Sequence, residues 1–247
     1  MEWFTMSIDL TIVVPAYHES DRIEQSLKDL SIAIQKYLDP KSTEVIVVSA
    51  DNNDPTADLA QKNSKLFKHF SVIRPGARVG KGRDVRLGIL AGKGKYRMFM
   101  DADMATPLHH LDQVKAFMES SGDIGIGIRP LASIHTGFRK VVSEIGNVLV
   151  QNLLTPGISD SQCGFKVFKA DVAEIIFPRL TIMGWGFDME LLTIARIHKY
   201  KIDTMTIPDW HDPKEEGLTG DSSLMVTFNT GIELLKILSG RWTGKYK

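Results

Sequence analysis

Short apolar runs alternate with helical patterns between residues 10 and 120, and this alternation limits the possible folds more than any other feature of the chain. The runs at 10–14, 44–48 and 96–100 have the length of buried strands. Between the first two, apolar residues recur every three or four positions from Ile23 to Leu38, which indicates an amphipathic helix. Strands that alternate with helices predict an α/β fold with a largely parallel twisted sheet and helices on both faces.

Two acidic residues directly follow the run at 96–100, in the triplet Asp101-Ala102-Asp103. Open α/β sheets bind ligands at the carboxyl ends of their strands, so both carboxylates are expected at that edge. Together they can hold one Mg²⁺ or Mn²⁺, whose remaining positions suit water and phosphate oxygens. An Asp-x-Asp triplet also occurs by chance as a solvated turn, so the interpretation as a metal site depends on other motifs.

A glycine-rich basic loop at 78–88 leads into a further helical pattern. Gly80 and Gly82 allow another group to approach the backbone closely, and Lys81 and Arg86 are expected to face a diphosphate. An ordinary solvated helix start is the alternative for both cations, and for Arg86 the choice stays open.

Five motifs occur in order along the chain. They are Pro15-Ala16-Tyr17-His18-Glu19 after a strand, the Gly-Lys-Gly loop at 80–86, Asp-Ala-Asp-Met-Ala-Thr-Pro at 101–107, Gln-Cys-Gly-Phe-Lys at 162–166 and Gly-Trp-Gly-Phe-Asp-Met-Glu at 184–190. In this order they resemble the inverting family 2 glycosyltransferases of GT-A fold, in particular the dolichyl-phosphate glucose and mannose synthases. The resemblance spans residues 10–210. It implies one domain over 1–247, with a donor half at about 8–120, an acceptor half at about 121–210, and a mobile loop plus amphipathic helix at 211–247.

The resemblance also implies where the donor binds. The nucleotide would contact Pro15, Ala16, Tyr17 and Glu19. Asp101 and Asp103 would hold the divalent metal, and His211 lies where related enzymes carry a late metal-contacting histidine. A solvated loop histidine is the alternative for His211, and His109 and His110 are expected at a helix start rather than as ligands.

One loop departs from the family pattern. After the second strand the family usually has Asp-Asp-Gly-Ser-x-Asp, whereas this chain has Ser49-Ala50-Asp51-Asn52-Asn53-Asp54. Two residues are candidates to recognise the nucleotide base in place of the missing aspartates. Asp51 could do so if the loop is rearranged, and Ser49 could do so through a neutral hydrogen bond. A chain that had lost donor binding would show the same change, so the identity of the base stays open.

The second half of the chain supplies candidates for the acceptor and for catalysis. Residues 123–129 resemble the family strand that ends in Gly-Ser-Arg, so Arg129 and Arg139 are candidates to bind an acceptor phosphate through the planar guanidinium. A surface helix is the alternative for Arg139. Asp160 and Asp188 are candidates for acid–base catalysis or for binding sugar hydroxyls. A hydroxyl acceptor needs a base such as Asp188, whereas a phosphate is already ionised and needs positioning and charge neutralisation.

Two further residues within the motifs have less direct interpretations. Cys163 is the single cysteine, which excludes an intramolecular disulfide, and a small buried side chain is favoured over a nucleophile. Glu190 follows Asp188 by two positions, so the two acids do not share a face if a helix begins here.

The composition and hydropathy of the chain limit the kinds of partner it is expected to bind. Basic and acidic residues number 30 each, so the net charge gives no overall electrostatic attraction to nucleic acid. No stretch approaches the roughly 20 apolar residues needed to span a bilayer, and the first residues do not form a signal peptide. The stripe from Leu224 to Leu238 precedes Arg241-Trp242-Thr243-Gly244-Lys245-Tyr246-Lys247, which suits a peripheral position on a membrane, expected at the cytoplasmic face.

The sequence therefore predicts a metal-dependent glycosyltransferase that moves a hexose from a nucleotide-sugar to a polyprenyl phosphate with inversion. Two alternatives remain: a transferase to a soluble or glycan hydroxyl, and a catalytically silent nucleotide-sugar binding module. The set of Asp101, Asp103, Arg129 and Asp188 argues against a silent module, because a scaffold does not need all four.

Overall fold

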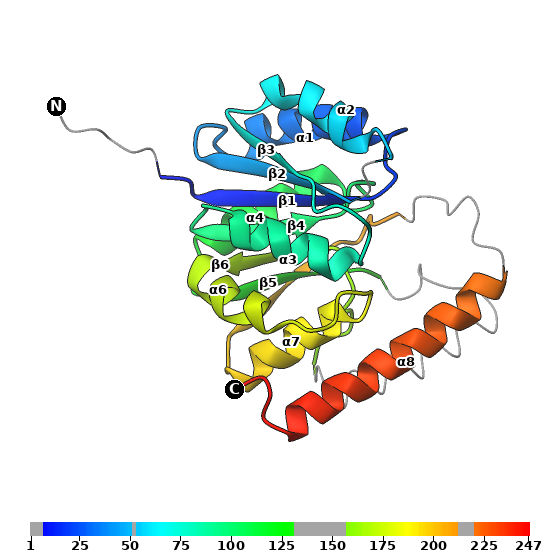
Figure 1. Ribbon diagram of the computed structural model, residues 1–247. Helices are drawn as coiled ribbons and strands as arrows, with labels where there is room; N and C mark the ends of the chain where they lie inside the picture. Colours follow the sequence, from blue (N-terminus) through cyan, green and yellow to red (C-terminus); the bar gives the residue numbers. More distant parts are fainter. Residues whose placement is uncertain (1–6, 51–52, 131–156, 212–219) are drawn as a thin grey trace.

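The protein folds into a seven-stranded mixed sheet between two layers of helices (Figure 1). The computed structural model describes residues 7–50, 53–130, 157–211 and 220–247, with the backbone alone for 220–230. The predictions for Asp51 and Arg139, and the side chains of Leu224 and Phe228, lie outside the described residues.

The sheet has the strand order β3-β2-β1-β4-β6-β5-β7. The strands are β1 Leu10–Ala16, β2 Thr43–Ser49, β3 His69–Ile73, β4 Tyr96–Met100, β5 Ile124–Ile128, β6 Phe165–Lys169 and β7 Ile202–Thr206. The pairs among β1, β2, β3 and β4 are parallel, as is β5 with β7, whereas β6 runs antiparallel to both β4 and β5. The predicted α/β fold with a largely parallel sheet is confirmed.

Helices cover both faces of the sheet, as the alternation predicted. They are α1 Ile23–Tyr37, α2 Thr56–Lys62, α3 Lys81–Ala91, α4 Leu111–Met118, α6 Ala170–Arg179 and α7 Phe187–Ile197, with short 3₁₀ helices η1 Ser64–Leu66 and η2 Leu108–His110. A further helix, α8 Gly220–Trp242, does not cover the sheet. Alternate residues of β4 enter opposite cores, with Met98 facing α1 and α4 and Phe99 facing α3, α6 and α7. The period of two along each strand thus divides the apolar side chains between two layers.

Helix α8 lies at the periphery and packs beside α7 rather than on the sheet (Figure 1). Ile237 is buried against Ile182 and Met189, whereas Leu235 faces solvent. The chain then turns back, and the ring of Tyr246 enters the core on the α7 side. The C-terminal segment is therefore fixed at its end by a buried aromatic residue.

Candidate donor and acceptor site

The Asp101-Ala102-Asp103 turn leaves β4 at its carboxyl end and is held by neighbouring groups. The Ser26 hydroxyl of α1 donates to the carbonyl of Ala102 at 2.7 Å, and the Ala105 amide donates to Asp103 Oδ1 at 3.0 Å. Met104 adopts a left-handed backbone conformation with φ 54°. Such a conformation is unfavourable for methionine and persists where surrounding contacts impose it.

Negative charge accumulates around this turn. Burial, followed by the charge of Asp101, raises the pKa of Asp103 above its usual range. Burial also raises the pKa of Glu19, with Asp103 and Asp101 adding to the effect and Arg22, 2.9 Å away, opposing it. Carboxylates that resist ionisation next to one another are stabilised by a hard divalent cation, so these residues fit Mg²⁺ or Mn²⁺.

Lys81 begins α3 and points at the same turn. Its Nζ lies 2.5 Å from Asp101 Oδ1 and 5.5 Å from the centroid of the Trp185 ring. Burial alone would lower the pKa of Lys81, but the charges of Asp101 and Asp188 outweigh it and raise that pKa. The side chain is therefore an ammonium ion facing the carboxylates, and its contact with a diphosphate stays a prediction.

The glycines around Lys81 serve packing rather than ligand approach. The Gly82 amide donates to the carbonyl of Met183 at 2.9 Å, so it is already engaged. A Cβ at Gly80, where φ is +155°, would overlap the same carbonyl, and a Cβ at Gly82 would lie 2.7 Å from Cβ of Phe187. The segment before α7 thus lies directly against the start of α3.

Arg86 is engaged with the end of α6. Its guanidinium donates to the carbonyls of Leu180 at 3.2 Å and Pro178 at 3.3 Å. These bonds join α3 to the end of α6, which differs from the solvated helix start that was the alternative. A contact between Arg86 and a diphosphate stays a prediction.

The expected nucleotide contacts lie at the ends of β1 and β2, where Ala16 pairs with Ser49. Ser49 is buried, and its hydroxyl finds no hydrogen-bond partner among the described residues. The Tyr17 ring stacks on His18, with centroids 4.2 Å apart, and the Arg78 guanidinium lies 4.0 Å from its centroid. An unsatisfied hydroxyl and an aromatic ring, both at the ends of these strands, suit a ligand with polar edges and a flat face.

Arg129 follows β5 and is clamped by Asp160. Its Nε and Nη2 donate to the two carboxylate oxygens at 2.6 and 2.9 Å, and its backbone amide donates to Oδ2 at 3.2 Å. The Gln162 amide adds a fourth bond at 3.2 Å, so Asp160 has little capacity left to move a proton. The geometry favours a role for Asp160 in orienting Arg129, whose guanidinium also lies over the Trp210 ring at 4.9 Å.

Asp188 lies near the start of α7 and is almost completely buried. Lys166 of β6, itself fully buried, places Nζ 2.5 Å from Asp188 Oδ1 and 2.6 Å from the carbonyl of Cys163. Burial raises the pKa of Asp188, and the charges of Lys166 and Lys81 oppose that rise. Burial also raises the pKa of the Cys163 thiol to about 11, which supports a structural cysteine.

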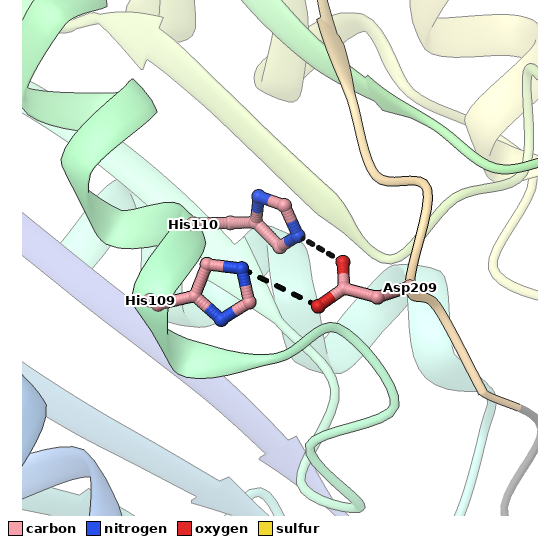
Figure 2. Close-up of side chains that lie close together, drawn as sticks. All are labelled: His109, His110 and Asp209. Carbon is pink, nitrogen blue, oxygen red and sulfur yellow. Dashed lines mark hydrogen bonds and ion pairs between the residues drawn. The ribbon is translucent and has the colours of Figure 1, made fainter.

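Figure 2 shows His109 and His110 of η2 facing Asp209, which follows β7. His110 Nε2 lies 2.6 Å from Asp209 Oδ1, and His109 Nε2 lies 3.3 Å from Oδ2. Gln113 Nε2 contacts both the carbonyl of Thr206 at 3.0 Å and His110 Nδ1 at 2.7 Å. Because a carbonyl only accepts, this amide donates to Nδ1, and Nε2 of neutral His110 then carries its proton toward Asp209.

This tautomer leaves no lone pair of His110 toward a cation, although the ligand atoms of His109, His110 and Asp209 lie within 4.8 Å of one another. We interpret the cluster as a hydrogen-bond chain that fixes Asp209. His211, two residues on, donates its backbone amide to the carbonyl of Ala105 at 3.3 Å, which places it beside the Asp-x-Asp turn. Within the described ranges, its side chain does not form a ligand group with Asp101 and Asp103, so its metal role stays a prediction.

Several residues of the site escaped sequence reasoning. Lys166 stands in the Gln-Cys-Gly-Phe-Lys motif, but nothing local marks it as a buried partner of Asp188. Gly164 gives a better signal, since a Cβ there would overlap the Asp101 carboxylate. Trp185 also stands in a recognisable motif, between two glycines, but nothing in the sequence predicts that its ring lies beside Lys81.

Comparisons with known proteins identify the family of the chain. The sequence model described as "Glycosyl transferase family 2" matches residues 11–177. The protein named dolichyl-phosphate beta-glucosyltransferase from Dictyostelium discoideum is 31% identical, over 93% of this chain and 72% of its own length. The Drosophila melanogaster protein of that name is 32% identical, over 81% of this chain and 67% of its own length.

The fold has solved counterparts as well. Glucosyl-3-phosphoglycerate synthase from Mycobacterium tuberculosis, in complex with Mn²⁺, UDP-glucose and phosphoglyceric acid, superposes with a TM-score of 0.69. It is 18% identical and covers 94% of this chain and 80% of its own. At this identity the likeness concerns the fold alone, and it confirms the predicted GT-A architecture.

Proposed function

The chain belongs to glycosyl transferase family 2, and on that premise we propose that it transfers a hexose from a nucleotide-sugar to a polyprenyl phosphate of the dolichyl type, with inversion. The observation that carries the proposal is that β4 and β5 both run antiparallel to β6, so that Asp101 and Arg129, which directly follow these two strands, lie at the same edge of the sheet. An arginine suited to binding an anion is thus available at the edge where the donor diphosphate is expected. The relatives named dolichyl-phosphate beta-glucosyltransferase support this acceptor and glucose as the sugar.

On the donor side, the chain supplies the carboxylates of Asp101 and Asp103 and the ammonium of Lys81. A divalent cation bound there would neutralise the diphosphate and so make it a better leaving group. Lys81 is flexible enough to contact the diphosphate from the start of α3. Mg²⁺ and Mn²⁺ both suit the oxygen ligands, and Mn²⁺ in the similar structure makes it the first ion to test.

On the acceptor side, an oxygen of the lipid phosphate attacks the anomeric carbon from the face opposite the diphosphate. A carbon–oxygen bond forms to the phosphate as the bond to the diphosphate breaks, and the nucleoside diphosphate leaves with the electron pair. The acceptor is already ionised, so no base is needed, and Arg129 neutralises and orients it.

A hydroxyl acceptor is the competing function, because it would need a base. Asp188 is the candidate for that role, and its raised pKa suits a base. However, its carboxylate is almost completely buried and paired with Lys166, which leaves little room for an incoming hydroxyl. This burial favours the phosphate acceptor.

The proposed acceptor lies in a membrane, and none of the described helices is long and apolar enough to cross a bilayer. The surface of the described residues therefore needs a place where it can contact lipid. Leu235 and Trp242 of α8 are 67% and 81% exposed, and Arg241 and Lys245 lie near Trp242 in sequence. We propose that this end of α8 rests on anionic lipid, with the ring at the interface and the cations on headgroups.

The test compares transfer from nucleotide-sugars with Mn²⁺, with and without polyprenyl phosphate, in wild type, Arg129→Ala and Arg129→Lys. We expect Arg129→Ala to lower kcat/KM for the lipid phosphate by about 100-fold, since a charge-assisted bidentate contact is lost, while donor affinity is retained. Arg129→Lys should recover only part of this kcat/KM, because the ammonium of lysine is a point charge and cannot form the bidentate contact of the planar guanidinium. Arg179→Ala, which removes an arginine that donates to the carbonyl of Ile175 at the end of α6, is the matched control.

Two outcomes would contradict the proposal. Robust transfer to a soluble sugar without transfer to the lipid would favour the hydroxyl acceptor, and failure to bind any nucleotide-sugar would favour a silent module. The same donor series tests the Ser49-Ala50 loop, which we expect to discriminate weakly between UDP- and GDP-sugars. A preference above about 100-fold, or about 2.7 kcal/mol, would show that other residues read the base.

A further inference from the structure

The Lys81 ammonium lies where a cation bound to the Asp-x-Asp turn would repel it. Its Nζ is 2.5 Å from Asp101 Oδ1, and Asp101 is one of the two carboxylates expected to hold the donor metal. Two cations cannot share one carboxylate at contact distance without strong mutual repulsion. Metal binding to Asp101 and the observed position of Lys81 therefore oppose each other.

We propose that Lys81 is an internal counter-cation that the donor displaces, so that metal and nucleoside diphosphate bind cooperatively and metal alone binds poorly. The inference rests on the proposed function and adds an order of events at its donor site. In the free protein Lys81 neutralises Asp101. When a metal–diphosphate arrives, the ammonium leaves Asp101 to the metal and moves onto the diphosphate.

The surroundings of Lys81 suit such an exchange. Its backbone is fixed, because the amide of the next residue, Gly82, donates to Met183 and because Gly80 can carry no side chain there. Its ammonium, in contrast, is held by the Asp101 carboxylate and the face of Trp185. A rigid base with a flexible four-carbon stem allows the charge to move while the loop stays in place.

Trp185 limits how far the ammonium can travel. Its loop is tied to α8, since the Gly186 amide donates to Glu233 Oε2 at 2.8 Å, and a Cβ at Gly186 would crowd the same carboxylate. The indole can therefore stay near the ammonium whether Lys81 contacts Asp101 or the diphosphate. Its cation–π contact is weaker than either ion pair and so does not hold the ammonium in one place. The exchange then needs a rotation of the lysine stem and no movement of the loop.

Cooperativity follows from the exchange. Metal alone must displace Lys81 and leave its charge without a carboxylate, whereas metal with diphosphate provides a new anionic partner. Each ligand therefore raises the affinity of the other by the same factor. Removing the ammonium should tighten the binding of metal alone and weaken the binding of the metal–diphosphate, two changes of opposite sign.

The experiment measures Mn²⁺ affinity of the full chain by calorimetry and by Mn²⁺ electron paramagnetic resonance, without nucleotide and with UDP or GDP. Lys81→Gln should bind Mn²⁺ alone about tenfold more tightly than wild type, and Mn²⁺ with nucleotide about tenfold more weakly. Lys81→Arg keeps the charge and should retain weak binding of Mn²⁺ alone. Lys95→Gln is the matched control, since Lys95 forms a 2.7 Å ion pair with Asp9 at the opposite end of β4.

Unchanged or weaker binding of Mn²⁺ alone by Lys81→Gln, or no binding by either protein, would overturn the exchange. Urea unfolding of each variant confirms that the fold is intact. Failure of the proposed function would look different, because no nucleotide would then bind wild type at any Mn²⁺ concentration. The Mn²⁺ affinities of wild type and Lys81→Gln without nucleotide would still test the role of Lys81.

Discussion

The carboxylates after β4 are partly exposed, whereas the carboxylate of Glu190 in α7 is fully buried, and their hydrogen-bond partners differ as well. Glu190 accepts four hydrogen bonds, from the amides of Thr181 and Ile182 at 2.8 Å each and from the hydroxyls of Thr181 at 2.6 Å and Tyr246 at 2.8 Å. Asp103 accepts a hydrogen bond from the backbone amide of Ala105, and burial, followed by the charge of Asp101, raises the pKa of Asp103.

The difference supports a structural role for Glu190 and the proposed metal-binding role for the turn. Every direction around Glu190 is filled by a donor of this chain, so it anchors the C-terminal segment and needs no ligand. The turn at Asp101 and Asp103 brings like charges together beside the flexible ammonium of Lys81, which is the arrangement that a bound cation would stabilise. Isosteric substitutions that remove only the charge should therefore affect the two places in opposite ways.

The largest effect is expected from Asp103→Asn. It keeps the shape but removes a charge from the turn, so metal-dependent donor binding should fall by about 1,000-fold, or about 4 kcal/mol. Stability should stay equal or rise slightly, because repulsion with Asp101 is relieved. Calorimetry with Mn²⁺ and nucleotide, together with urea unfolding, measures both; unchanged affinity would remove the metal site from the proposal.

Glu190 should show the reverse pattern. Glu190→Ala leaves the buried amide of Ile182 and the partly buried amide of Thr181 without an acceptor, so the free energy of unfolding should drop by about 3 kcal/mol. Glu190→Gln should cost about 1 kcal/mol or less, since its oxygen can face the amides and the two hydroxyls can accept from its NH₂. Urea denaturation gives both values, and a larger loss in Gln than in Ala would refute the assignment.

Tyr246→Phe should have the smallest effect, about 1 kcal/mol, because it removes one hydrogen bond to Glu190 and keeps the buried ring. Burial and the bond to Glu190 raise the pKa of Tyr246 above its usual range. Its stabilisation is therefore complete below the unfolded pKa of about 10 and is lost as pH rises toward the folded value. Unfolding free energies between pH 8 and 11 should converge for wild type and variant; a constant difference would exclude this titration.

Local patterns predicted the elements of the fold well. The run at 96–100 coincides with β4, and the stripe at 224–238 lies within α8. The antiparallel strand β6 was not predicted, because it carries the buried Lys166 among its apolar residues and so lacks a simple alternation. Its insertion between β4 and β5 brings Gly164 and Lys166 to the site.

The sequence predicted which residues belong to the candidate site better than it predicted which of them contact one another. Spacing selected Asp101, Asp103 and Lys81, and it left Arg86 open between a diphosphate contact and a solvated helix start, whereas the guanidinium bonds to the end of α6. Gly82 was expected to allow close approach to its backbone, and its neighbours are the Met183 carbonyl and Phe187. In both cases the partner lies on a segment that is distant along the chain.

The sequence alone determined the parallel half of the sheet and the position of two aspartates at a strand end, because periodicity and adjacency are local properties of the chain. Only the tertiary structure decided that Lys81 neutralises Asp101, that Asp160 clamps Arg129 and that Lys166 pairs with Asp188. Each pair joins segments far apart along the chain. Hydrophobic spacing selects which face of an element is buried, but the partner of a charge depends on distance in space, which falls to contact only after the layers have packed.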